Sequence, residues 1–413
     1  MTGKLSQYLN TENLLKVCLG LSLMGLFGGK FVPPQFYRYA LTIALILLTT
    51  DAIQNSTGAR QAVTNPFVWL WLFVLFTLAL SMSQFVNSPG PATEYRIPFH
   101  VKTLLYSATL IWLMSATIRL ERDLNWLFVP MLVALGLVFL DFLLRFGTIL
   151  ITNQAQEWVA ARFELALKVA LLILFVPPSI FFFRQTRARL FISALGLVAM
   201  SLLFALGLRS GWLLGGGLLA LWVAFRPRLA VTLFPLILVS AAVLAWFGPN
   251  YAMERLHSGF HDLGERPTVA WRPALKMIAD RPWRGFGFGG HYPKTLQEYL
   301  NRDPDGNNPT IHIRDPHNFY LQMAWHGGAI TITALFAAMS FLIWLLLREF
   351  RSYVRLGNSD ARKLLYVLIW SLLILWSGII ANSETPDIFS FSMLFAISSV
   401  WFNLDRRAKE AAK

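Results

Sequence analysis

Long apolar stretches separated by short polar segments dominate the chain. Twelve of these stretches come close to the roughly 20 apolar residues that a helix needs to cross a bilayer. They lie at residues 14–29, 36–53, 66–84, 100–118, 125–144, 163–183, 190–208, 211–225, 229–247, 317–347, 363–381 and 388–404. The pattern predicts an all-α polytopic membrane protein with about 12 transmembrane helices.

One polar segment is much longer than the others and lies between the ninth and tenth stretches, at residues 248–316. Loops longer than roughly 15 residues in compact proteins are usually functional or disordered. This one carries Trp, Phe and Tyr throughout, whereas disordered chains are poor in aromatic residues. We therefore expect three parts: helices 1–9 over residues 1–247, a folded loop domain over 248–316, and helices 10–12 with a tail over 317–413.

The distribution of lysine and arginine orients the predicted helices. With the N-terminus in the cytoplasm, nineteen Lys and Arg residues fall in the inside segments and seven in the short outside segments. The positive-inside rule favours this orientation. Both termini are then cytoplasmic and the loop domain faces outward. The polar start of the chain shows no small-residue cleavage site, so no cleavable signal peptide is expected.

Composition excludes a soluble protein and several kinds of metal site. The chain is 56% hydrophobic and 14% charged, whereas soluble domains are about 25% charged. The formal net charge of +14 suits anionic lipid head groups, a phosphate-bearing substrate or nucleic acid. Cys18 is the only cysteine, which excludes a disulfide framework, Fe–S ligation and a cysteine-cluster zinc site.

Arg209 is the first candidate for chemistry. Only the short sequence Arg209-Ser210-Gly211-Trp212 lies between two apolar stretches. This position places the arginine at the outer interface or slightly within it. A cation there is costly unless it faces a cavity, a partner or a lipid phosphate. The alternative is an arginine that extends to the head groups.

Arg272 is the second candidate. Residues 273–281 predict a short amphipathic helix, with Pro273 in its first position and Pro282 after its end. Arg272 would stand beside the helix N-terminus, where free N–H groups, the helix dipole and a guanidinium favour a diphosphate. The alternative is a solvated face that carries Arg272 and Lys276.

His317 is the third candidate, because it begins the helix that re-enters the membrane. A neutral histidine can accept a proton from a hydroxyl group, and Asp315 is near enough to orient it. The alternative is an interfacial or capping histidine. Lys168, inside a predicted helix, either reaches a lipid phosphate or extends outward. The glycine-rich segment 285–290 predicts a turn, and no histidine or carboxylate pattern predicts a metal site.

Taken together, these features resemble the O-antigen ligase and polymerase superfamily of bacterial envelope enzymes. The likeness runs from about Arg209 to Leu321, and Pro273 departs from the small residue expected after the family's loop arginine. Three stretches carry it: Arg209-Ser210-Gly211-Trp212; Trp271-Arg272 with Met277, Pro282 and Gly285-Phe286-Gly287; and His317-Asn318 followed by nine residues, Gly328, two residues and Thr331. The last is the most specific, because it is the ligase pattern.

The resemblance implies a GT-C-like, inverting and metal-independent glycosyltransferase of the bacterial inner membrane, with its active site facing the periplasm. The donor would be a glycan on undecaprenyl diphosphate and the acceptor a sugar hydroxyl of lipid A–core. Arg209 and Arg272 would clamp the diphosphate, and His317 would be the general base. Lys168, Asp315 and Asn318 are further candidates for substrate binding. We expect no cofactor and no nucleic-acid partner. We expect membrane lipids as partners.

Two other functions stay open. A polymerase or a protein O-oligosaccharyltransferase of the same superfamily would differ only in its acceptor. A transporter of an anionic substrate is the more distant alternative. Transporters often have two related halves with broken helices, and neither half-to-half similarity nor symmetry is visible here.

Overall fold

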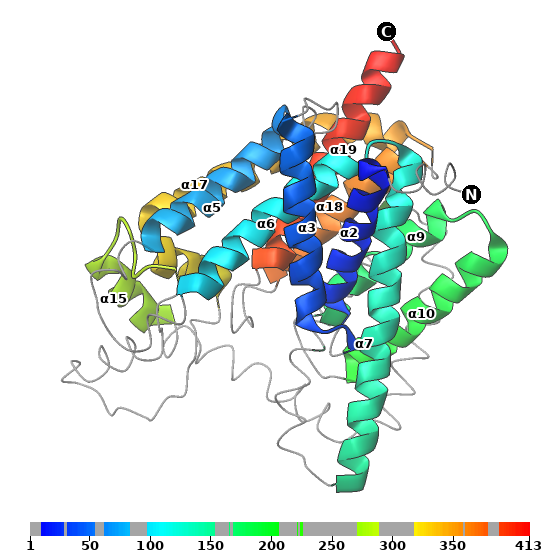
Figure 1. Ribbon diagram of the computed structural model, residues 1–413, viewed down its shortest axis with the longest axis horizontal. Helices are drawn as coiled ribbons and strands as arrows, with labels where there is room; N and C mark the ends of the chain where they lie inside the picture. Colours follow the sequence, from blue (N-terminus) through cyan, green and yellow to red (C-terminus); the bar gives the residue numbers. More distant parts are fainter. Residues whose placement is uncertain are drawn as a thin grey trace.

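The computed structural model describes residues 10–28, 31–53, 62–82, 97–152, 165, 168–205, 221, 224–225, 271–288, 318–357, 360–378 and 388–413. All regular secondary structure within these ranges is helical (Figure 1). The helices are α2 (Thr11–Phe27), α3 (Pro34–Ile53), α5 (Pro66–Met82), α6 (Ile97–Thr117), η2 (Glu121–Leu124), α7 (Asn125–Thr152), α9 (Val176–Phe182), α10 (Thr186–Ala205), α15 (Arg272–Asp280), α17 (Phe319–Arg355), α18 (Ala361–Gly378) and α19 (Ile388–Ala411).

These helices coincide with the apolar stretches predicted to be helical. The exceptions are 211–225 and 229–247, which fall almost wholly outside the described residues. Several helices extend past the apolar part, and α17 ends at Arg355 rather than at residue 347. The reason is that hydropathy detects only the apolar section, whereas polar residues such as Arg and Glu continue a helix readily.

Two of the described helices are long and apolar enough to cross a membrane, at Glu121–Arg145 and Phe319–Arg355. Large hydrophobic side chains also lie exposed on the helix surfaces, including Trp69, Phe73 and Phe76 of α5 and Trp344 of α17. Exposed apolar area of this extent suits a lipid surface better than water. The described residues therefore have the features of a helical membrane protein. Twelve crossings stay a prediction.

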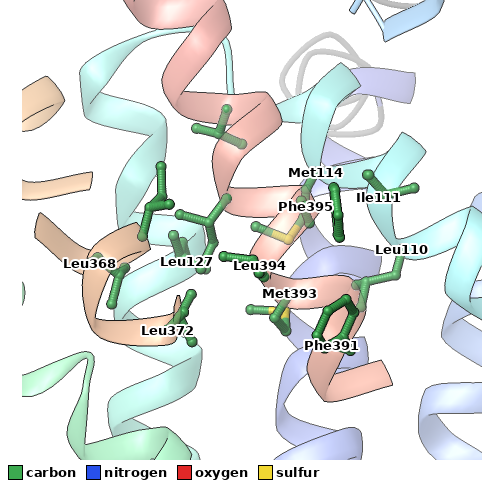
Figure 2. Close-up of a cluster of buried hydrophobic side chains, with 14 of the residues drawn as sticks. Leu110, Ile111, Met114, Leu127, Leu368, Leu372, Phe391, Met393, Leu394 and Phe395 are labelled. Carbon is green, nitrogen blue, oxygen red and sulfur yellow. The ribbon is translucent and has the colours of Figure 1, made fainter. Parts of the chain in front are cut away.

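Helix α19 lies at the centre of the packing. It contacts α6, α5 and α18, while α2 packs between α3 and α7 (Figure 1). Figure 2 shows how the α19 side chains fill the interior against three other helices. The labelled residues are Phe391, Met393, Leu394 and Phe395 of α19; Leu110, Ile111 and Met114 of α6; Leu127 of α7; and Leu368 and Leu372 of α18.

The bundle has two different ends. At one end, α2 begins and α17 and α19 finish, with Lys409 of α19 paired to Glu349 of α17 at 3.0 Å. At the other end, α15 packs on the beginning of α17 (Figure 1). The beginning of α2 and the end of α19 therefore lie at the end of the bundle opposite α15 (Figure 1). That the chain ends are cytoplasmic stays a prediction.

Candidate functional site

Helix α15 begins one residue earlier than predicted. It spans Arg272–Asp280, so Pro273 takes the second position rather than the first. Both positions tolerate proline, because the N–H groups of a helix's first turn have no partner within the helix. The correction makes Arg272 the first residue of the helix rather than its neighbour.

The amphipathic character predicted for α15 is confirmed. Ala274 and Met277 are 0% exposed and pack against Trp325 of α17. Arg272 and Lys276 lie on the exposed face. The turn that follows adds the exposed Arg281 and Arg284, and Asp280 is the one carboxylate in the described segment 271–288. This surface is therefore strongly basic, as binding of an anionic group requires.

Helix α17 is broken at Gly328, which has a φ of 65° and a ψ of −161°. In a continuous helix, the N–H groups of Ala329 and Ile330 would donate to the carbonyls of Trp325 and His326. A break leaves such groups in need of other partners, and an unpaired buried group is costly.

The turn after α15 supplies those partners. Its N–H groups donate to the α17 carbonyls, and its carbonyls accept from the α17 N–H groups. Four main-chain bonds result: Phe286 to Trp325 at 2.7 Å, Gly287 to His326 at 2.8 Å, Ala329 to Pro282 at 2.6 Å, and Ile330 to Trp283 at 3.5 Å. We call this arrangement the turn–break junction, formed by residues 281–288 and 325–330.

Two glycines make the turn–break junction possible. A Cβ atom on Gly328 would lie 2.4 Å from the carbonyl carbon of Trp283, and one on Gly285 would lie 2.4 Å from the carbonyl oxygen of Trp325. Both glycines also have positive φ, 65° and 63°, which other residues rarely adopt. The prediction of a turn at residues 285–290 is confirmed over its described part, and its role is to approach another backbone closely.

Side chains reinforce the junction. Phe286 stacks on Trp325 with ring centroids 5.5 Å apart, and the Arg281 guanidinium lies 4.9 Å from the centroid of the Phe286 ring. The N–H of Phe288 donates to the Ser81 hydroxyl of α5 at 3.0 Å. The turn is thus attached to two helices of the bundle, which fixes where α15 stands.

The structure describes three of the six predicted site residues. Arg272 is exposed at the start of α15. Asn318 is the N-cap of α17, and its Oδ1 accepts from the N–H groups of Tyr320 and Leu321 at 3.0 and 3.2 Å. Lys168 is half-buried in a helical segment before α9. Arg209, Asp315 and His317 lie outside the described residues.

The arrangement joins two of the predicted motifs. Arg272 and Asn318 belong to helices that pack together, α15 and α17, and Asn318 follows His317 directly in the chain. Sequence analysis did not single out Trp325 and His326, which line the junction. The signal was present: a histidine and two consecutive glycines interrupt a long apolar helix at 326–328.

The fold and this surface define a class: an all-helical membrane protein that presents a basic helix beside a broken membrane helix. Comparison with known families is more specific. Residues 192–336 match the O-antigen ligase family, a range that includes α15, the turn–break junction and the first part of α17. The match covers 145 of the 413 residues, and it shows that this segment is similar to O-antigen ligases. No curated protein matches the chain.

Proposed function

We propose that this protein is an O-antigen ligase, which transfers a glycan from undecaprenyl diphosphate to a sugar hydroxyl of lipid A–core. The observation that carries the proposal is the packing of α15 on α17 through the turn–break junction. In this packing, the helix that carries Arg272 contacts α17. The N-cap of α17 is Asn318, which follows His317 directly in the sequence. The ligase pattern His317-Asn318, nine residues, Gly328, two residues and Thr331 supports a ligase over a polymerase.

The proposed reaction is a single displacement at the anomeric carbon. The acceptor hydroxyl oxygen forms the new glycosidic bond, the bond to the diphosphate breaks, and the configuration inverts. His317 takes the hydroxyl proton, a contribution of about 10²–10⁴ in rate. Arg272 and Arg209 stabilise the charge that develops on the lipid diphosphate. In this mechanism the two arginines stabilise the diphosphate charge in place of a divalent ion.

The remaining candidates have supporting roles in the proposal. Asp315 orients His317, Asn318 fixes the helix start beside it, and Lys168 contacts lipid phosphate. The proposal also includes about twelve crossings of the bacterial inner membrane, a loop domain over 248–316 in the periplasm, and cytoplasmic chain ends.

A reconstituted reaction tests the proposal. Purified protein is incubated with an undecaprenyl-diphosphate glycan and lipid A–core in excess EDTA, and the lipid products are separated on a gel. We expect glycan to appear on lipid A–core. Longer lipid-linked glycan with untouched core would show a polymerase instead, and glycan on added acceptor protein would show a protein O-oligosaccharyltransferase. No product at all would favour the alternative function, a transporter of an anionic substrate.

Two substitutions test the assigned roles. Arg272→Ala and His317→Ala should each lower transfer at least a hundredfold while the protein still inserts. Arg406→Ala is the matched control, because this exposed arginine pairs with Glu410 at the opposite end of the bundle. Normal transfer by His317→Ala at equal expression would remove the histidine from the mechanism.

A further inference from the structure

His326 is a buried histidine with no part in the proposed reaction. It lies in α17, two residues before the break, and is 7% exposed. Its Nδ1 is 3.1 Å from the carbonyl oxygen of Gly287. A carbonyl oxygen only accepts hydrogen bonds, so Nδ1 carries the proton in this contact.

Two hydrogen bonds therefore join His326 to Gly287. The Gly287 N–H donates to the His326 carbonyl at 2.8 Å, and the His326 ring donates to the Gly287 carbonyl. The ring also contacts the aromatic rings of Phe288 and Trp325 edge-on, with centroids 5.3 and 4.9 Å away. Gly287 is thus held at both of its main-chain groups by a single residue.

The Gly287 carbonyl would lack its side-chain donor without this histidine. Gly287 is buried, so water cannot easily take the place of the lost donor. A buried carbonyl without a partner is costly, and the turn would open or shift to relieve it. Because the turn connects α15 to the rest of the bundle, a shift there would move Arg272.

We propose that His326 is a positioning residue, which fixes the turn after α15 against the break in α17 and so sets where Arg272 stands relative to the beginning of α17. The inference rests on the proposed function for its effect on transfer, but not for its effect on structure. Displacement of a substrate-binding group such as Arg272 by about 1 Å can lower an enzyme's rate on the order of a hundredfold.

Two substitutions that differ in one methylene separate positioning from general packing. His326→Asn places its amide nitrogen near the position of the imidazole Nδ1. His326→Gln places its amide nitrogen near the position of Nε2, from which it does not reach the Gly287 carbonyl. Both variants replace the ring by a smaller polar amide, so the loss of aromatic contacts is common to the two.

The first measurement is hydrogen exchange at residues 286 and 287 of the full-length protein, read by mass spectrometry of peptides. These amides donate to Trp325 and His326 across the junction. We expect exchange to be about tenfold faster in His326→Gln than in His326→Asn. Peptides from α19 should exchange equally in both, which shows that the bundle is folded. Equal exchange at 286 and 287 in the two variants would overturn the proposal.

The second measurement is glycan transfer by the same variants. We expect His326→Gln to lose on the order of a hundredfold in rate at saturating donor, and His326→Asn to recover most of it. If His326→Gln transfers at the wild-type rate, His326 does not position the site. If the wild type itself transfers nothing, the proposed function fails, while the exchange result still decides whether His326 holds the turn.

Discussion

The two ends of the helix bundle are held together by different chemistry. At the turn–break junction, main-chain groups bond to main-chain groups, and glycines allow the backbones to meet. At the opposite end, charged side chains join the helices. Lys16 of α2 pairs with Asp123 of η2 at 2.9 Å and with Glu12 at 2.8 Å, and Lys409 of α19 pairs with Glu349 of α17.

This difference in bonding determines which substitutions and which changes of pH each end of the bundle tolerates. Main-chain bonds at the junction survive most substitutions, but they fail wherever a Cβ atom enters the space between the backbones. Ion pairs at the charged end depend on side-chain identity and on pH. The hydrogen bond and charge of Lys16 hold the pKa of Glu12 below its usual range. Burial alone would lower the pKa of Lys409, but hydrogen bonds to Asp405 and Glu349 raise it.

The largest effect is expected from Gly328→Ala, which tests whether the junction depends on close backbone approach. Alanine at a φ of 65° and a ψ of −161° costs about 1–3 kcal/mol, because essentially only glycine adopts this conformation. Its Cβ would also lie 2.4 Å from the Trp283 carbonyl carbon, which cannot move without displacing the turn. We expect a loss of about 3–5 kcal/mol in the free energy of unfolding, measured as a lowered Tm of the purified protein in detergent.

Gly136→Ala is the control for this experiment. Gly136 lies inside α7, and a Cβ there would meet nothing within 4 Å. The same substitution should leave stability unchanged or raise it by up to about 1 kcal/mol, because alanine favours a helix interior. If the two variants unfold at the same temperature, close approach is not what the junction requires.

The sequence predicts the parts of this architecture that depend on residues close together in the chain. It does not predict the parts that depend on residues far apart in the chain. The helices follow from local apolar patterns, and α15 follows from Pro273 in its first turn and Pro282 after its end. The junction joins residues about 40 positions apart through main-chain atoms, and main-chain bonding leaves no pattern in side-chain types. Residues 317–347 were predicted as one long stretch that tilts or starts as a loop, and for that reason the break at Gly328 was missed.

The candidate site is predictable only in part. The sequence pattern identified Arg272 and Asn318, and the structure puts their helices in contact. His326 was missed, because a histidine in an apolar helix has no distinctive neighbours until the turn that it binds is placed beside it. The proximity of Arg209 and His317 to Arg272 stays a prediction, since those two residues lie outside the described ranges.

The charged end should respond to loss of charge rather than to added volume. In Asp123→Asn, Lys16 loses its closest buried partner. Asp123 is 5% exposed, and its other carboxylate oxygen accepts from the Leu120 N–H at 2.9 Å, a bond that asparagine can keep. We expect a loss of about 2–3 kcal/mol in the free energy of unfolding, again measured from the Tm in detergent.

Glu410→Gln is the matched control for a lost carboxylate. The side chains of Glu410 and Arg406 are more than half exposed, and such pairs contribute about 0–1 kcal/mol. A drop in Tm as large as that of Asp123→Asn would contradict the view that burial gives the charged end its strength.

The smallest effect concerns pH and Asp360, at the start of α18. Burial alone would raise the pKa of Asp360, but hydrogen bonds from Arg362 lower it below the usual range. A carboxyl whose pKa is lower in the folded state adds stability above its unfolded pKa and loses it as the pH falls through the folded value.

Asp360→Asn should therefore lower the Tm at pH 7 by about 2 °C, corresponding to roughly 1 kcal/mol. The gap between the two proteins should narrow as the pH falls below the usual range of an aspartate carboxyl, because the folded state then loses this contribution. A gap that does not narrow at all as the pH falls would mean that asparagine disturbs the helix start rather than the ion pair.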